Sequence, residues 1–461
     1  MFNSKVYVER RKLLKKQVKS GVLLFPGNVE SPMNYAGNTY HFRQDSSFLY
    51  YFGLDKPGFT GFIDVEENKD YLFGEDFTID DIIWMGPQPT VKDLGAQVGV
   101  KETGSPTQLA EKIETAITAG RKVHFLPPYR AENMLQLEKL LAITSSKLKQ
   151  YASVDLIKAV VAQRELKSAE EVAEIENALG ISGEMYTIVM QLAMPGAYER
   201  EISGKIEGLA GMHGSQISFP VILSIHGETL HNHYHGNQLA KDQLLVADSG
   251  VESPLHYASD ITRTFPVGGT FTPRQLPVYQ LVLKAQMAAI EAIKPGISYK
   301  EIHLQTAKII ASGLKDIGLM KGNMDDAVNV GAHALFFPHG LGHQMGLDVH
   351  DMEALGENYV GYDETVQRST QFGLAYLRMA KKLRTGHVIT VEPGIYFIPA
   401  LIDLWKGEKK YTDFINYNLL EEYRAFGGIR IEDDVLVTEK GYRVLGKPIP
   451  KEVEEIEALM N

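Results

Sequence analysis

Residues 244–266 read Leu-Leu-Val-Ala-Asp-Ser-Gly-Val-Glu-Ser-Pro-Leu-His-Tyr-Ala-Ser-Asp-Ile-Thr-Arg-Thr-Phe-Pro, two apolar runs that each carry a carboxylate. Asp248 ends the first run, and Asp260, twelve residues later, begins the second. This spacing is consistent with the two arms of a β-hairpin. A carboxylate in a buried strand is costly unless a cation or hydrogen bonds compensate its charge. The stretch therefore indicates a hairpin that carries two acidic groups in need of positive charge.

Two later β-type runs carry a carboxylate in the same way. Glu392 lies within Val-Ile-Thr-Val-Glu-Pro-Gly-Ile-Tyr (388–396), and Glu432 lies within Gly-Ile-Arg-Ile-Glu-Asp (428–433). One such carboxylate alone is as readily explained by a solvated face or an internal ion pair. Four of them, each embedded in an apolar run, favour a functional cluster.

Histidines gather in two short windows. The Gly-rich run His-Gly-Leu-Gly-His-Gln-Met-Gly-Leu-Asp-Val-His (339–350) carries three of them, and His231, His233 and His235 form a second group. A lone histidine is more often a structural group than a ligand. Six of the chain's 14 histidines lie in these windows, which favours function, because histidine is the commonest neutral metal ligand and proton carrier.

Four carboxylates and one imidazole form an oxygen-rich ligand set. Such a set suits Mn²⁺ or Co²⁺, or Zn²⁺ among carboxylates. The chain has no cysteine, so thiolate ligands and disulfides are excluded. Two cations bridged by shared carboxylates would lie about 3.5–4 Å apart and lower the pKa of a water between them. The residues therefore predict a hydrolase with two divalent metal ions.

The composition is that of a globular enzyme, with 44% hydrophobic and 23% charged residues in 461. The formal net charge of −11 argues against a nucleic acid or an anionic membrane as the main partner. No run approaches the ~18 apolar residues of a membrane span. The first twenty residues lack the apolar core of a secretory signal, so we expect a cytoplasmic location.

The pattern of elements predicts two domains, residues 1–160 and 161–461. The first reads as α/β, with short strands at 22–25, 71–73 and 123–126 and helices at 108–117 and 131–143. The second opens with the capping box Ser168-Ala-Glu-Glu171 and a helix to about Leu192. Its later segments are expected as strands at 219–224, 244–248, 261–267, 387–396 and 428–438, helices at 273–293 and 299–317, and an insertion loop at 406–422. This mixture predicts an α+β domain with a curved, mainly antiparallel sheet.

Five motifs, in order, resemble the proline-specific pita-bread metallopeptidases, the family that contains aminopeptidase P and prolidase. They are Asp-Ser-Gly (248–250), Ser-Asp-Ile-Thr-Arg-Thr-Phe-Pro (259–266), the His-Gly-Leu-Gly-His run with the following Asp (339–351), Thr-Val-Glu-Pro-Gly (390–394) and Gly-Ile-Arg-Ile-Glu-Asp (428–433). Phe-Arg-Gln-Asp-Ser (42–46) and Ile-Trp-Met-Gly (83–86) are similar to motifs of the same enzymes' N-terminal domain. The resemblance implies an α/β N-terminal domain plus an α+β C-terminal pita-bread (creatinase/aminopeptidase-like) catalytic domain.

The resemblance also implies a role for each site residue. Asp248 would chelate one metal, His343 would bind the other, and Asp260 and Glu432 would bridge both. Glu392 would be a ligand and the proton acceptor from the attacking water. His350 and His233 would contact the substrate and move protons, and His339 would line the pocket. Arg430 would lie beside the proline. The resemblance also implies a homodimer or homotetramer, in which Trp84 would reach the active site of a neighbouring subunit.

The sequence departs from the family pattern at three points. The gap between Asp248 and Asp260 is one residue longer, with Ser253-Pro254 as the extra element, and a shift inside a strand would turn Asp260 to the other face. The spacing before Asp248 leaves His231 as a rival of His233. The insertion at 401–426 is more typical of a prolidase.

The expected activity is that of an Xaa-Pro aminopeptidase, with small peptides that carry proline second as substrates. The alternative is a prolidase, which accepts Xaa-Pro dipeptides alone. Creatinase and methionine aminopeptidase are less consistent with the full ligand set and the large N-terminal domain. A non-catalytic binding module on the same fold is the remote alternative. Such a module would be expected to have lost metal ligands, whereas all five ligand positions here carry a competent side chain.

Overall fold

The computed structural model describes all 461 residues and divides into two compact units. Unit 1 comprises Met1–Arg164 and Met352–Tyr359, and unit 2 comprises Glu165–Asp351 and Val360–Asn461. The predicted boundary at residue 160 falls inside helix α8 (Val154–Arg164), at whose last residue unit 1 ends. The short helix α14 (Glu357–Val360) closes the segment that returns to unit 1.

A five-stranded mixed sheet forms the centre of unit 1. Its order is β6 (Glu102–Gly104), β5 (Lys69–Phe73), β4 (Thr60–Asp64), β1 (Val22–Pro26) and β7 (Val123–Phe125). The outer pairs β5–β6 and β1–β7 are parallel, and the inner pairs are antiparallel. The short hairpin β2 (Pro32–Tyr35) and β3 (Asn38–Thr39) is separate from this sheet.

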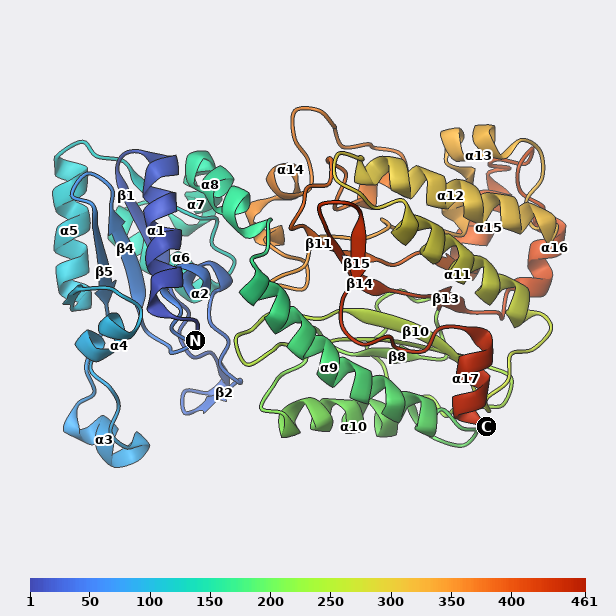
Figure 1. Cartoon of the computed structure of the whole chain (residues 1–461), viewed down its shortest axis with the longest axis horizontal. Helices are drawn as coiled ribbons and strands as arrows, with labels where there is room; N and C mark the ends of the chain where they lie inside the picture. Colours follow the sequence, from blue (N-terminus) through green and yellow to red (C-terminus); the bar gives the residue numbers. More distant parts are fainter. The chain divides into compact units, whose positions relative to one another are not determined.

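Helices α5 and α6 bury their apolar faces against this sheet. Leu109 and Ile113 of α5 and Leu137 of α6 join the sheet residues Phe62 and Phe125 in one core. The helices of the unit are α1 (Ser4–Val18), α2 (Ser46–Phe52), α3 (Ile79–Met85), α4 (Val91–Gln97), α5 (Pro106–Thr118), α6 (Ala131–Leu141), α7 (Leu148–Tyr151) and α8. The predicted α/β domain is confirmed, together with the three strands and two helices expected for it (Figure 1).

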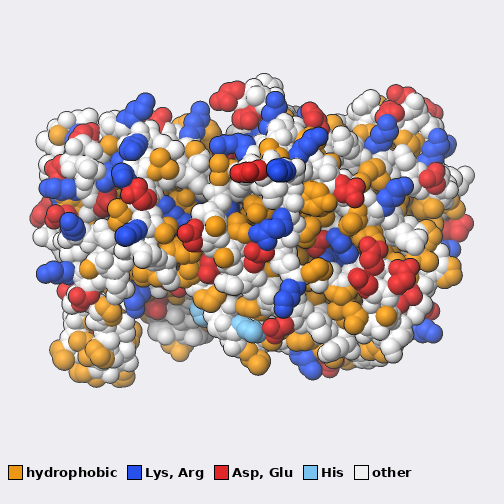
Figure 2. All heavy atoms as spheres, viewed as in Figure 1, with side chains coloured by type: hydrophobic (Ala, Val, Ile, Leu, Met, Phe, Trp, Pro, Cys, Tyr) orange, Lys and Arg blue, Asp and Glu red, His pale blue; other side chains and the backbone are white.

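Helix α3 stands apart from the core of unit 1. It begins with a capping box at Thr78, yet it buries no residue. Ile79, Ile83 and Met85 are exposed, and Trp84 is 86% exposed. The projection at the lower left of Figure 2, where Figure 1 places α3, is accordingly rich in hydrophobic side chains. Such a contiguous apolar surface is typical of a binding interface.

Every strand pair of unit 2 is antiparallel. One sheet has the order β10 (Ile261–Pro266), β9 (Leu244–Ser249) and β8 (Ile222–Ser224). A second has the order β11 (Val388–Val391), β14 (Asp433–Val437) and β15 (Tyr442–Val444), and β12 (Gly394–Tyr396) pairs with β13 (Gly428–Arg430). The predicted α+β domain with antiparallel strands is confirmed.

The extra residue between Asp248 and Asp260 lies in the hairpin turn. Asp248 on β9 is opposite Thr262 on β10, and the register continues without a shift to the end of the strands. In the turn, the Ser253 backbone N–H donates to the Tyr257 carbonyl over 2.8 Å, and His256 adopts a φ of 65°. The strands themselves are therefore regular.

The two long strands predicted at 387–396 and 428–438 are each broken in the middle. Val391 pairs with Asp433 and Gly394 pairs with Arg430, so the two breaks face each other. Pro393 has no N–H group to donate to a strand ladder, which explains the first break. The Glu432 backbone N–H donates instead to the Thr262 carbonyl over 3.0 Å, which joins the second break to β10.

The helices of unit 2 cover its sheets (Figure 1). They are α9 (Ala169–Leu192), α10 (Glu199–Met212), α11 (Gln275–Glu291), α12 (Tyr299–Asp316), α13 (Met324–Val330), α15 (Pro399–Gly407), α16 (Tyr417–Leu420) and α17 (Val453–Met460). The capping box predicted at Ser168 is present at the start of α9. No helix of the structure has the length and apolar character needed to cross a membrane.

The prediction of a loop at 406–422 is wrong at its two ends and right between them. Helix α15 ends at Gly407, α16 (Tyr417–Leu420) and a 3₁₀ turn (Glu421–Tyr423) close the segment, and residues 408–416 contain no helix. Helix α15 has Pro399 in its first turn, where the missing N–H costs nothing. Ile402 and Trp405, three residues apart, are its buried residues. The helix is short and has apolar residues on both its buried and its exposed sides, Leu404 being 55% exposed, so its sequence shows no clear helical period.

Candidate active site

One cavity of unit 2, with a volume of about 560 Å³, gathers the residues singled out in the sequence. Its lining includes all five expected metal ligands, which are Asp248, Asp260, His343, Glu392 and Glu432. His231, His233, His339, His350 and Arg430 also line it. The rest of the wall is mainly apolar, with Phe219, Pro220, Ile222, Leu230, Pro338, Val349, Phe372 and Tyr376.

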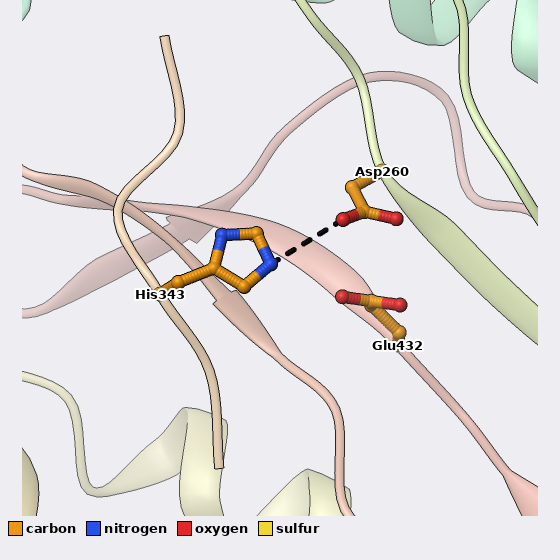
Figure 3. Close-up of side chains that lie close together, drawn as sticks. All are labelled: Asp260, His343 and Glu432. Atoms are coloured by element: carbon orange, nitrogen blue, oxygen red, sulfur yellow. Dashed lines mark ion pairs between the residues drawn. The ribbon is translucent and has the colours of Figure 1, made fainter. Parts of the chain in front are cut away.

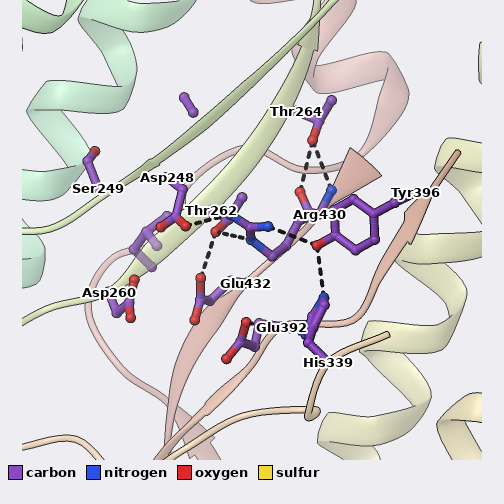
Figure 4. Close-up of polar contacts among 12 residues, drawn as sticks. Asp248, Ser249, Asp260, Thr262, Thr264, His339, Glu392, Tyr396, Arg430 and Glu432 are labelled. Carbon is purple, nitrogen blue, oxygen red and sulfur yellow. Dashed lines mark hydrogen bonds and ion pairs between the residues drawn. The ribbon is translucent and has the colours of Figure 1, made fainter. Parts of the chain in front are cut away.

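Each carboxylate comes from an end or an interruption of a strand. Asp248 lies near the end of β9 and Asp260 directly precedes β10. Glu392 lies in the break between β11 and β12, and Glu432 in the break between β13 and β14. The facing breaks thus bring two glutamates from segments 40 residues apart to one side of the sheet, close to the hairpin aspartates (Figure 4).

Asp260, His343 and Glu432 form the tightest part of the cluster (Figure 3). One ligand atom from each of these three buried residues lies within 4.8 Å of the other two. The His343 Nε2 atom is 3.4 Å from Asp260 Oδ2 and 3.7 Å from Glu392 Oε1. These separations allow several donor atoms to share one cation.

A backbone hydrogen bond assigns the tautomer of His343. Its Nδ1 atom lies 3.1 Å from the Gln344 carbonyl oxygen, which can only accept, so Nδ1 carries the proton. In the neutral ring the lone pair is then on Nε2, which faces the carboxylates of Asp260 and Glu392. A lone pair directed at carboxylate oxygens is unfavourable without a cation between them.

The buried carboxylates are strongly perturbed. Burial raises the pKa of Asp260 and of Glu432 well above their ordinary values, and the repulsion of neighbouring carboxylates raises both further. Burial also raises the pKa of Glu392 to about 8, although the Arg430 charge opposes that rise. Asp248 Oδ1, Asp260 Oδ1 and Glu432 Oε1 are buried without a hydrogen-bond partner. This set of unsatisfied oxygens fits divalent cations.

Arg430 is the buried cation of the cluster (Figure 4). Its Nη2 donates to Asp248 Oδ2 over 2.5 Å, and its Nε donates to Thr262 Oγ1 over 3.1 Å. Thr262 in turn donates to Glu432 Oε2 over 2.6 Å. Arg430 therefore orients two carboxylates, one directly and one through a hydroxyl group.

A directed hydrogen-bond chain runs from Arg430 to His339. Arg430 Nη1 donates to the Tyr396 hydroxyl over 2.8 Å, and Tyr396 lies 2.9 Å from His339 Nε2. His339 Nδ1 donates to the Gly340 carbonyl over 2.8 Å, so Nε2 accepts the Tyr396 proton. Burial lowers the pKa of His339 to about 3, which keeps the ring neutral. His339 is thus a fixed wall of the cavity, 3.9 Å from Glu392 Oε2.

The other histidines differ in their surroundings. The His350 ring lies 4.2 Å from the His343 ring, measured between centroids. His231 and His233 both line the cavity, so the structure keeps both as candidates for substrate contact. His235 is different, because its Nε2 lies 3.1 Å from the Val221 carbonyl oxygen and the residue is absent from the cavity wall.

The comparisons with known proteins agree with this geometry. The model of metallopeptidase family M24 matches residues 173–439, and that of the aminopeptidase P N-terminal domain matches residues 7–124. The chain belongs to metallopeptidase family M24. The predicted family is therefore confirmed, and the protein is a metal-dependent peptidase rather than a non-catalytic module.

Among its M24 relatives are both aminopeptidases and a dipeptidase. A probable Xaa-Pro aminopeptidase of Botryotinia fuckeliana is 33% identical over 423 residues, 91% of this chain and 88% of that protein. The human Xaa-Pro dipeptidase is 32% identical over 454 residues, 96% of this chain and 89% of that protein. Aminopeptidase P from E. coli, solved with the inhibitor Pro-Leu, has a TM-score of 0.82 and 28% identity, with 100% of this chain and 98% of that chain covered.

Several residues of this M24 site were not predicted from the sequence. Tyr396 is the last residue of the run 388–396 that carries Glu392. Two-residue alternation along a strand could have placed Tyr396 on the same face as Glu392 and Gly394. Thr262 lies inside a quoted motif, but its link to Glu432 depends on a contact between distant segments. Arg378, which also lines the cavity, stands in no recognisable pattern.

Proposed function

We propose that this peptidase hydrolyses the bond before proline at the N-terminus of peptides, as an Xaa-Pro aminopeptidase. The observation that carries the proposal is the meeting of four carboxylates and His343 in one cavity. The names of relatives that span most of the chain support the same substrate class. The mainly apolar remainder of the wall suits a compact apolar residue such as proline.

We further propose that two divalent cations occupy the site and that they are Mn²⁺, with Co²⁺ or Zn²⁺ as alternatives. Asp248 would hold one cation, His343 the other, and Asp260 and Glu432 both. When bound, the cations would supply the charge that lowers the pKa of a water and polarises the scissile carbonyl. A Zn-substituted aminopeptidase P of E. coli is among the similar structures, with a TM-score of 0.81.

The protein residues would divide the remaining work. Glu392, at the edge of the cluster and with a raised pKa, would accept a proton from the attacking water. His350 and His233 or His231 would contact the substrate and move protons at the reacting carbonyl and the leaving nitrogen. Arg430 would hold Asp248 in place and shape the wall beside the proline.

The second candidate function is that of a prolidase. The human Xaa-Pro dipeptidase covers as much of the chain as the aminopeptidases do, and the insertion at 401–426 favours this alternative. The two activities would use the same cluster and differ in whether the substrate continues beyond proline.

Cleavage of a tripeptide separates these functions. We expect Ala-Pro-Ala to be cleaved to alanine and Pro-Ala, with a kcat/KM at least equal to that for Ala-Pro. Both products can be followed by liquid chromatography, and Ala-Ala-Ala serves as the control that lacks proline. Cleavage of Ala-Pro without cleavage of Ala-Pro-Ala would establish the prolidase alternative.

Metal removal tests the proposed cofactor. Dialysis against a chelator should abolish hydrolysis, since the protein residues alone would neither lower the pKa of the attacking water nor polarise the scissile carbonyl. Adding back Mn²⁺ should restore activity at two ions per chain, counted by elemental analysis and compared with Co²⁺ and Zn²⁺. A chelated enzyme that contains no metal and keeps full activity would contradict the proposal.

We propose a homodimer or homotetramer as the assembly, with Trp84 reaching the site of a neighbouring subunit. The support on this chain is helix α3, whose side chains include Trp84 and are exposed without covering any core of their own subunit. A cytoplasmic location stays a prediction of the sequence.

A further inference from the structure

Two aromatic side chains belong to the exposed part of the cavity wall, which also includes Pro220, His231 and His233. Phe372 and Tyr376 line the cavity, yet they are 36% and 55% exposed, whereas the carboxylate cluster is buried. Their ring centroids are 6.0 Å apart and their planes are at 89°. This edge-to-face pair thus lies where a bound molecule would leave the cavity and enter solvent.

The insertion packs behind this pair. Trp405 of α15 is 3% exposed, does not line the cavity, and meets the Phe372 ring edge-on with a centroid distance of 5.8 Å. Two residues of the insertion also contact Trp405: the Tyr411 ring centroid lies 5.3 Å from the Trp405 ring centroid, and Lys410 Nζ lies 4.3 Å from it. Trp405 is therefore held in place by the insertion and limits how far Phe372 can recede.

Hydrogen bonds hold both the insertion and the segment that carries Phe372 in place. The Tyr411 hydroxyl donates to the Val330 carbonyl over 2.6 Å, and the Gln371 side chain donates to the Asn329 carbonyl over 3.1 Å. Both the insertion and the segment with Phe372 are thus tied to the end of α13. Gly373 has a φ of 88°, and a Cβ atom there would lie 2.8 Å from the Ala334 Cβ. The aromatic wall is therefore formed before substrate binds.

The chemistry of the proposed reaction determines what meets this wall. An Xaa-Pro aminopeptidase takes a single residue on the N-terminal side of the cleaved bond, so substrates differ in length only beyond the proline. Phe372 and Tyr376, in the exposed part of the wall, are placed to contact that extension. Aromatic rings with exposed faces bind apolar side chains and peptide planes without demanding one sequence.

We propose that Phe372 and Tyr376 form a subsite for the residues that follow proline, and that Trp405 positions this subsite and so sets the preference for peptide length. The proposal rests on the proposed function, which it deepens by naming peptides longer than two residues, with an apolar residue after proline, as the preferred substrates. Phe372 and Tyr376 contact the substrate, and Trp405 acts through Phe372.

The test compares Ala-Pro with Ala-Pro-Phe-Ala on the metal-loaded enzyme. Trp405→Ala and Phe372→Ala should each lower kcat/KM for the tetrapeptide about tenfold through KM, a factor that corresponds to about 1.4 kcal/mol. The kcat/KM for Ala-Pro should change less than about threefold in the same variants, since the dipeptide ends at the proline. Trp405→Phe should restore most of the loss. The matched control is Leu404→Ala, at an exposed position next to Trp405 on α15, which should change neither substrate.

The outcomes separate this proposal from the function on which it depends. Wild-type enzyme that cleaves neither peptide would overturn the proposed function itself. Wild-type enzyme that cleaves Ala-Pro but not the tetrapeptide would overturn the subsite while leaving a prolidase. An equal loss for both substrates in Phe372→Ala and Trp405→Ala, or no loss for either, would also overturn the subsite, because a general structural role does not depend on peptide length.

Discussion

Replacing Glu392 with alanine is expected to lower kcat by about a thousandfold and to leave the fold intact, since a positioned proton acceptor contributes about 10²–10⁴ in rate. The side chain lies 3.7 Å from His343 Nε2 and 3.9 Å from His339 Nδ1, and no hydrogen bond from it holds two elements together. Its backbone N–H donates to the Leu341 carbonyl over 2.9 Å, a contact that alanine keeps. The loss should therefore appear in turnover rather than in stability.

Two matched variants make this prediction specific. Glu392→Gln keeps the volume and removes the basic oxygen, so it should lose nearly as much activity as Glu392→Ala. Glu439→Ala removes an exposed glutamate and should behave as wild type. Steady-state hydrolysis of Ala-Pro-Ala, circular dichroism, thermal unfolding and metal content would be measured for all three. A Glu392→Ala enzyme with a full metal complement and wild-type kcat would refute its role as proton acceptor.

The sequence was most informative where chemistry depends on one short segment. The hairpin spacing, the capping box at Ser168 and the carboxylates of the apolar runs are local features, and the structure contains them. The five motifs also placed Asp248, Asp260 and Glu432 in one cluster, because charge in an apolar strand needs a partner wherever the chain supplies one.

Features that depend on pairing between distant segments could not be predicted in the same way. Alternation along 428–438 suggested one continuous strand, but the break there faces Pro393, which has no N–H to donate, and the Glu432 backbone N–H donates to the Thr262 carbonyl of β10 instead. The link from Thr262 to Glu432 needs that same juxtaposition. Helix α15 was missed because two buried residues are too few to show a period.

Breaking the ion pair between Lys167 and Asp351 is expected to destabilise unit 2 by about 3–5 kcal/mol, the range for a buried pair that loses one partner. Lys167 Nζ lies 2.8 Å from Asp351 Oδ2, and each side chain is 1% exposed. Asp351 directly follows His350, and its backbone N–H donates to the Gln344 carbonyl over 2.9 Å. The pair therefore anchors the end of the segment that carries His343 and His350.

Lys167→Met keeps the length of the side chain and leaves the buried Asp351 carboxylate without its lysine partner. Its melting temperature should fall by about 6–10 °C, measured by calorimetry. Lys308→Met is the matched control, because it breaks an exposed ion pair to Asp325 and should cost about 1 kcal/mol at most.

The double variant Lys167→Met/Asp351→Leu removes both charges. It therefore separates the stability lost with the attraction between the two side chains from the cost of burying the Asp351 charge without Lys167. It should recover most of the stability, since an apolar replacement of a buried pair is often neutral. The double variant should still show a raised KM, because the segment with His350 would be less tightly fixed even when the fold is stable. Equal stability of Lys167→Met and Lys308→Met would show that water reaches the Asp351 carboxylate, and the ion pair would then have no special role in holding the His350 segment.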